Sequence, residues 1–231
     1  MKKNIGLKVS LILNLLLVFA LLFVVLGTTS ANSTLPNNAT KKIKLKYEQR
    51  TSLFRQLETH NVDAVFIGDS ITERSLWNEF FPDKVVVNRG IESDTTTGVL
   101  KRLDNINSLN PKKIFLLIGI NDLRYGEKVE SVFVRYSNII STLQNQSPNT
   151  QIYIQSVFPV VEGKGNIKNK DIDELNKKIK TLATTDNIVY IDINSRLKLN
   201  DGLNPKYSND GLHIMGNAYV IWADTIRKYI E

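Results

Sequence analysis

Short apolar runs and longer amphipathic stretches alternate along most of this chain. The short runs are rich in β-branched residues and apolar almost throughout, which is typical of strands covered on both faces. They lie at residues 62–67, 84–88, 113–119, 151–158 and 187–193. Apolar residues recur at helical spacing over residues 43–58, 95–107, 127–146, 169–184 and 215–230. This alternation predicts an α/β fold, in which helices cover both faces of one parallel sheet and right-handed crossovers join the strands.

A different pattern fills the N-terminal segment, residues 1–31. Lysines precede an apolar run over residues 9–26 that contains no charged residue. A helix of that length spans about 27 Å, close to the roughly 30 Å of a membrane's hydrocarbon core. We expect an N-terminal hydrophobic helix that is either retained as a single-pass anchor, with its N-terminus inside, or cleaved as a signal peptide near residues 29–31. Either outcome places the remainder outside the cytoplasm, with residues 32–42 as a polar spacer and 43–231 as one domain.

Composition narrows the chemistry that this domain can perform. Cysteine is absent, which excludes disulfides and thiolate metal sites. The only histidines are His60 and His213, too few for a zinc site built on several imidazoles, so we expect no metal and no cofactor. The net charge is +7, but without the three lysines of the N-terminal segment 27 basic residues face 23 acidic ones. These charges are interspersed, and we expect no nucleic-acid partner.

Polar residues that could take part in catalysis follow four of the predicted strands. Because the carboxyl ends of parallel strands meet at one edge of a sheet, we expect these residues to lie close together. The segments are Gly68-Asp69-Ser70 after the first strand, Asn88-Arg89-Gly90 after the second, Gly119-Ile120-Asn121-Asp122 after the third, and, beyond the fifth, a loop with Asp210 and His213.

Ser70 has two interpretations. It lies three residues before Glu73, so the pair fits a capping box at the start of a helix. It also fits a serine nucleophile at a strand-to-helix turn. In that case His213 is the base that takes the hydroxyl proton, and Asp210, three residues earlier, orients the imidazole.

An acyl-transfer site also needs donors for the oxyanion that forms on the substrate. Three donors are present at the predicted sheet edge: the backbone N–H of Ser70, the backbone N–H of Gly90, and the side-chain amide of Asn121.

These motifs, "GDS", Gly90, "GIND" and "DGLH", closely resemble the SGNH (GDSL-type) hydrolase superfamily. "NRGIESDTTTGVLKRL" followed by "PKKIFLLIGINDL" is similar to the branch with the platelet-activating-factor acetylhydrolase catalytic subunits. The resemblance covers about residues 62–230. It implies a flavodoxin-like three-layer α/β/α fold with a five-stranded parallel sheet in the order 2-1-3-4-5.

The resemblance also implies a role for each motif residue. Ser70 is the nucleophile, Asp210 and His213 complete the catalytic triad, and Gly90 and Asn121 join the Ser70 amide in the oxyanion hole. The chain departs from that branch at residues 92–93, where Glu-Ser stands in place of further glycines. This departure bears on the shape and polarity of the acyl pocket.

We therefore expect an extracytoplasmic serine esterase that removes a small acyl group, acetyl by this resemblance, from a lipid or a cell-surface glycan through an acyl-enzyme. The membrane is a further partner if the N-terminal helix is retained. Three alternatives remain open from the residues. One is an O-acyltransferase with the same triad, which would need an acyl donor from across the membrane. Another is a phosphoesterase with Asp69, Asp122 and Asp210 as metal ligands, and the last is a binding module with an inactive site.

Overall fold

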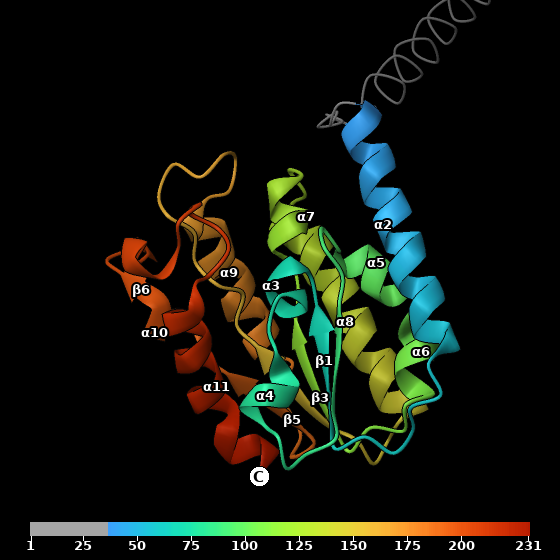
Figure 1. Cartoon of the computed structure of the whole chain (residues 1–231). Helices are drawn as coiled ribbons and strands as arrows, with labels where there is room; N and C mark the ends of the chain where they lie inside the picture. The colour runs from blue at the N-terminus through green and yellow to red at the C-terminus, as the bar shows by residue number, and fades with distance from the viewer. Residues whose placement is uncertain (1–36) are drawn as a thin grey trace, which may run out of the picture. The chain divides into compact units, whose positions relative to one another are not determined.

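The computed structural model describes residues 37–231, and Figure 1 shows their arrangement. The expected N-terminal hydrophobic helix, at residues 9–26, lies outside the described residues. No helix within the described part of the chain is both long enough and apolar enough to cross a membrane. The first described helix, α2, covers Asn37–Gln56. It therefore begins inside the segment expected to be a polar spacer.

The centre of the fold is a parallel sheet of five strands in the order β2-β1-β3-β4-β5, which confirms the predicted order. In this sheet Gly68 lies beside both Gly90 and Leu117, so three strands end at the same level. The third strand ends two residues earlier than expected, because the chain turns at Gly119 with φ +127°. The strands are β1 (Ala64–Gly68), β2 (Val86–Gly90), β3 (Lys113–Leu117), β4 (Gln151–Gln155) and β5 (Ile188–Ile191).

The predicted helices are present, and several short elements appear between them. Helices at the predicted places are α5 (Thr96–Leu100), α6 (Leu103–Asn107), α8 (Val129–Gln146), α9 (Asn169–Lys180) and α11 (Gly216–Ile230). Elements that the periodicity did not predict are α3 (Ser70–Glu73), α4 (Trp77–Phe80), α7 (Ile120–Arg124), α10 (Asn194–Leu197), the hairpin of β6 (Lys198–Leu199) and β7 (Gly202–Leu203), and the 3₁₀ turn η1 (Pro205–Tyr207). Most are too short for a period to be visible.

One predicted helix, at 95–107, is two helices. The break falls at Arg102, whose backbone leaves the helical region at φ −128° and ψ 15°. Its guanidinium is buried and bonded to Asp94 and to the Gly68 carbonyl. The interruption of the helix therefore accompanies a contact with the carboxyl end of β1.

Helices cover both faces of the sheet, and each face has its own core. On one face the ring of Phe66 in β1 stacks on Trp77 of α4, which meets Trp222 of α11 edge to face. The opposite face is covered by α5, α6, α8 and α9, which pack on one another, with Tyr136 fully buried there. The three-layer α/β/α arrangement is visible in Figure 1, and in such sheets sites form beyond the carboxyl ends of the strands.

Candidate active site

In the turn between β1 and α3, the residue that caps the helix is the neighbour of Ser70 and not Ser70 itself. Asp69 is the N-cap of α3, and its Oδ1 accepts a hydrogen bond of 2.9 Å from the Ile71 N–H. The Glu73 carboxylate pairs with Arg50 of α2 instead of reaching back to the helix start. Because Asp69 caps the helix, the Ser70 hydroxyl is not needed there. The capping-box interpretation of Ser70 is therefore not what the structure shows.

The Ser70 hydroxyl instead meets the histidine from the far end of the chain. Ser70 Oγ lies 3.0 Å from His213 Nε2, and His213 Nδ1 lies 2.6 Å from Asp210 Oδ2. Asp210 Oδ1 accepts from the N–H groups of Leu212 and His213 at 2.9 and 2.8 Å. Burial acts to raise the pKa of Asp210, but these hydrogen bonds outweigh it and hold that pKa well below its usual range. An ionised Asp210 fixes the imidazole with Nδ1 protonated and Nε2 facing Ser70.

The loop that bears Asp210 and His213 is held against the segment after β4. Val161 N–H donates to the Gly211 carbonyl at 2.9 Å, and the Lys164 ammonium donates to the Asp210 carbonyl. Ser208 Oγ accepts from Gly211 N–H at 2.8 Å. The segment after β4 therefore provides contacts that position Asp210 beside His213.

Asn121 lies at the same sheet edge, in the first turn of α7. One N–H of its side-chain amide donates to the Asp94 carbonyl at 3.0 Å, which fixes the orientation of the amide. An amide nitrogen has two N–H bonds, so the second remains for a ligand. The role of Asn121 as an oxyanion donor stays a prediction.

Gly90 does not have its expected role in this structure. Its backbone N–H donates to the side-chain Oδ1 of Asn88 at 2.9 Å, so this donor is already used. A Cβ at Gly90 would lie 2.3 Å from the backbone nitrogen of Glu73, inside van der Waals contact. Glycine is therefore required here because α3 packs directly on the end of β2.

Ser93 presents a donor that the sequence analysis missed. The turn from Ile91 to Asp94 is closed by a 3.1 Å hydrogen bond, and Ser93 has φ +64° at its third position. This is the geometry of a type II turn, in which the N–H of the third residue is not used by the turn. Among residues 37–231 that N–H has no hydrogen-bond partner. The sequence did contain a signal for this turn, because glycines at residues 92–93 in related chains are typical of a backbone with positive φ. Serine at this position can also adopt positive φ, at an energetic cost.

Asn88 is a second residue that the sequence analysis did not single out. Its Oδ1 accepts from the Gly90 N–H, and its Nδ2 lies 2.9–3.1 Å from three carbonyl oxygens to which it can donate. These belong to Thr72, Glu73 and Ser75, at the end of the helix that begins with the serine. The Asn88 side chain therefore holds the C-terminal end of α3 against β2.

Buried carboxylates support the turn that follows β2. Asp94 forms an ion pair with Arg102 at 2.8 Å, and Arg102 also donates to the Gly68 carbonyl at 3.3 Å. Asp122 accepts from the hydroxyl and the N–H of Thr96 at 2.5 and 3.0 Å. Burial raises the pKa of both carboxyls, while the hydrogen bonds and nearby arginines oppose it. These bonds join the ends of β1 and β3 to the turn that contains Ser93.

The three aspartates of the metal-dependent alternative have separate structural tasks. Asp69 caps α3, Asp122 bonds Thr96, and Asp210 bonds His213. Within residues 37–231 no group of three or more potential ligands is arranged to hold a metal ion.

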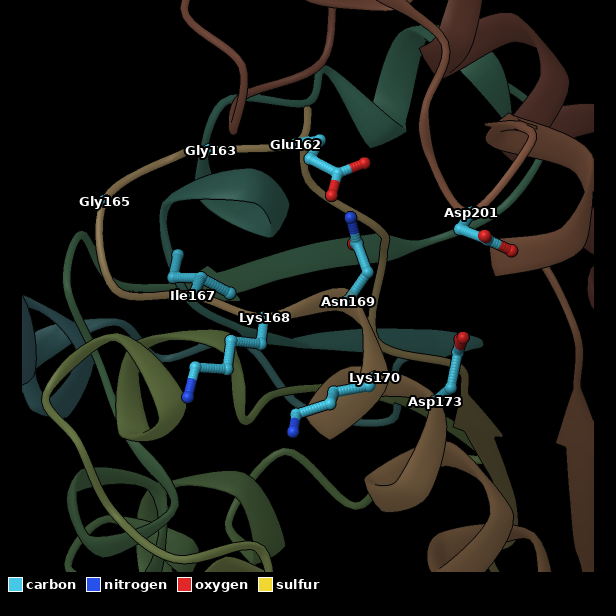
Figure 2. A pocket seen from close by; sticks show the side chains of 9 residues that line it. All are labelled: Glu162, Gly163, Gly165, Ile167, Lys168, Asn169, Lys170, Asp173 and Asp201. Atoms are coloured by element: carbon cyan, nitrogen blue, oxygen red, sulfur yellow. The ribbon is translucent and has the colours of Figure 1, made fainter.

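A cavity of about 570 Å³ lies between the 162–170 loop and the residues around Asp201 (Figure 2). Glu162 and Asn169 lie at its centre, whereas the ammonium groups of Lys168 and Lys170 point away from Glu162. None of the triad residues lines it. This cavity is therefore separate from the catalytic serine.

An α/β sheet with Ser, His and Asp hydrogen-bonded in series at its carboxyl edge has the arrangement of a serine hydrolase. The model of the GDSL-like lipase/acylhydrolase family matches residues 66–219. The chain belongs to this family, as the motifs indicated.

Curated relatives agree with this assignment. The human platelet-activating factor acetylhydrolase IB subunit alpha2 is 27% identical over 165 residues, which are 68% of this chain and 71% of that protein. The N-acylneuraminate cytidylyltransferase of Streptococcus agalactiae serotype V is 24% identical over 191 residues, 83% of this chain but only 43% of that protein.

Solved structures share the fold. A Streptococcus pneumoniae protein provisionally named a platelet activating factor has a TM-score of 0.77 at 27% identity, covering 84% of this chain and 96% of that chain. The acetylxylan esterase Axe2 of Geobacillus stearothermophilus has a TM-score of 0.59 at 18% identity, over 75% and 95% of the two chains. The second similarity shows the fold alone.

Proposed function

We propose that this hydrolase cleaves a small acyl ester, acetyl in the simplest case, by way of an acyl-enzyme on Ser70. The observation that supports it best is the continuous hydrogen-bonded series from Ser70 Oγ through the His213 ring to the Asp210 carboxylate, at 3.0 and 2.6 Å. A serine hydroxyl is a weak nucleophile unless a base accepts its proton, and this series provides that base.

The reaction proceeds in two steps. Ser70 Oγ attacks the ester carbonyl carbon while His213 Nε2 takes the hydroxyl proton; the imidazolium then gives that proton to the alcohol oxygen as the carbon–oxygen bond breaks. A water molecule, deprotonated by His213, attacks the resulting ester on Ser70, releases the carboxylic acid and restores the hydroxyl. Asp210 remains ionised throughout and stabilises the imidazolium.

The negative charge on the substrate oxygen is stabilised by three donors. Two are backbone N–H groups, of Ser70 and Ser93, which have no partner among the described residues. The third is the Asn121 amide, already oriented by Asp94. Donors fixed before the reaction avoid reorganisation, and each contributes roughly 10²–10³-fold in rate.

The natural ester belongs, in this proposal, to a lipid or a cell-surface glycan encountered outside the cytoplasm. The acetylhydrolase relatives support a small acyl group. The lysines and the apolar run of residues 1–31 support export, with the N-terminal helix as a membrane anchor if it is retained. Labelling of intact cells with a membrane-impermeant serine-reactive probe tests the location.

The mechanism is tested by hydrolysis of p-nitrophenyl esters from acetate to octanoate with the full chain. We expect Ser70→Ala and His213→Ala to lower kcat by at least about 10³-fold, since members of a triad act as a unit. A fluorophosphonate should label Ser70, as located by mass spectrometry.

His60→Ala is the matched control, because the other histidine bonds only the Ser108 carbonyl, at 2.7 Å. This variant should keep its activity. A wild-type chain that neither turns over the esters nor labels at Ser70 would disprove the proposal.

A further inference from the structure

Arg89, near the end of β2, is a buried cation without a carboxylate partner in the described part of the chain. The residue is 3% exposed. Its Nη1 donates one long hydrogen bond, of 3.3 Å, to the carbonyl of the preceding Asn88. Its Nε and Nη2 are buried and have no partner among residues 37–231. Buried charges are ordinarily paired, because removing an ion from water is costly.

The two unpartnered nitrogens of Arg89 belong to the same edge of the guanidinium. The N–H of Nε and one N–H of Nη2 run parallel on that edge, whereas Nη1 lies on the other side. Arginine uses this pair of N–H bonds to bind a single anion through two hydrogen bonds. The free donors therefore indicate one shared ligand and not two separate ones.

The charges around Arg89 do not balance. Burial, together with repulsion from Arg102 and Arg50, lowers the pKa of Arg89 to about 10, so the group is still charged at neutral pH. Arg102 pairs with Asp94 at 2.8 Å, and Arg50 of α2 pairs with Glu73 at 3.2 Å. Three guanidinium groups therefore face two carboxylates, and the remaining positive charge is that of Arg89.

An aromatic ring provides only part of the missing compensation. The centre of the Phe54 ring lies 4.7 Å from the guanidinium carbon of Arg89, but it also lies 4.9 Å from that of Arg50. A contact between a cation and a ring recovers less than the hydration that a buried ion loses, and here two cations share one ring. Water would accept the free N–H bonds and leave the charge uncompensated.

We propose that Arg89 binds a chloride ion through Nε and Nη2, at the junction of β2 with α2. One negative charge neutralises the excess of the arginine cluster. Arg89 lines neither the cavity of Figure 2 nor a cavity of about 260 Å³ between α2 and the turn that contains Ser93, which favours a monatomic ion over a phosphate or carboxylate ligand. The site does not depend on the proposed esterase function, and its effect is on the stability of the fold.

The test is thermal unfolding of the full chain at constant ionic strength, while sodium chloride replaces sodium gluconate. A ligand that binds only the folded chain raises Tm, by about 3–6 °C at ten times its dissociation constant. Arg89→Met keeps an unbranched side chain and removes the charge. This variant should lose the response to chloride and, in gluconate, unfold at a higher temperature than wild type. Arg196→Met, at an exposed arginine of α10, is the matched control and should respond like wild type.

Two further measurements keep the test independent of the folding of Arg89→Met. Arg89→Lys retains the charge without the paired N–H bonds and should need about tenfold more chloride for the same rise in Tm. Exchange with the bound ion should broaden the chlorine NMR signal in wild type and in Arg196→Met more than in Arg89→Lys.

The proposal is overturned if the Tm of wild type stays constant as chloride replaces gluconate, since the free N–H bonds would then belong to water. Responses of equal size in wild type and Arg89→Met, or in wild type and Arg89→Lys, would also overturn it. Stronger stabilisation by phosphate than by chloride would assign the site to an oxyanion and contradict the choice of ion.

Discussion

Asp69 shows how one buried side chain leaves its neighbour available for catalysis. The carboxyl is fully buried, accepts from Ile71 through Oδ1, and its Oδ2 has no partner among the described residues. Burial, aided by the charges of Asp94 and Asp122, raises the pKa of Asp69 to about 7. Capping by Asp69 therefore comes with a titration in the neutral pH range.

This titration predicts a pH-dependent stability. Unfolded Asp69 titrates near 3.8, so between about pH 4 and 7 the folded chain keeps a proton that the unfolded chain has lost. The free energy of unfolding must therefore fall, through this group, as pH rises across that window. Asp69→Asn retains the acceptor and removes the titration. We expect the Tm of the variant relative to wild type to increase from pH 4 to 7 and then level off.

Thermal unfolding followed by circular dichroism between pH 4 and 9 measures this difference. The exposed Asp104→Asn is the control, which should show a constant difference from wild type. An Asp69→Asn curve parallel to that of wild type would show that Asp69 is ionised throughout.

At the level of elements, the end of β2 and the turn that follows it place two residues with opposite requirements three positions apart. Gly90 lies where any Cβ would overlap the backbone of α3. Ser93 has positive φ, which is unfavourable for a residue with a Cβ. Glycine is therefore required at residue 90, where φ is not positive, and absent at residue 93, where φ is positive.

Opposite stability effects follow from these two positions. Gly90→Ala should lower the free energy of unfolding by at least about 2 kcal/mol, because α3 must move off β2. Ser93→Gly should raise it by about 0.5–1 kcal/mol, since the relief of strain exceeds the added entropy of the unfolded chain. Denaturant unfolding measures both.

The activities of the same variants distinguish the two oxyanion assignments. Ser93→Gly keeps the backbone N–H and should keep ester turnover. Gly90→Ala should lose turnover together with stability, through displacement of Ser70. If Gly90→Ala remained as stable as wild type and lost only activity, a direct catalytic role for Gly90 would be restored.

Over the whole molecule, the site brings together residues that are far apart along the described chain. Ser70 and His213 are 143 residues apart in sequence. Helix α11, which follows His213, returns to the serine through Tyr219, whose hydroxyl donates to the Ile71 carbonyl at 2.8 Å. This bond links the helix after the base to the helix of the nucleophile.

Tyr219 is therefore a positioning residue. Tyr219→Phe should lower kcat by roughly tenfold with little change in KM, because a small displacement of Ser70 relative to His213 affects the chemical step more than binding. Steady-state kinetics measures the two constants. Tyr229→Phe, on the same helix, is the control. Equal falls in both variants, or a change confined to KM, would contradict a positioning role.

The sequence alone was sufficient for the sheet and for the residues at its active edge. Apolar runs identify strands because burial on both faces demands them locally, and polar residues after those runs must meet once the strands are parallel. Ser70, Asn121, Asp210 and His213 were found in this way. The strand order came from the family resemblance.

The tertiary structure decided which of the candidate atoms are free to react. Whether Gly90 N–H is available depends on Asn88, whether Ser70 must cap α3 depends on Asp69, and whether a cavity exists beside Ser93 depends on α2. Periodicity describes which side of an element faces the core. It contains no information on hydrogen-bond partners, because these are set by the spatial arrangement of groups after folding.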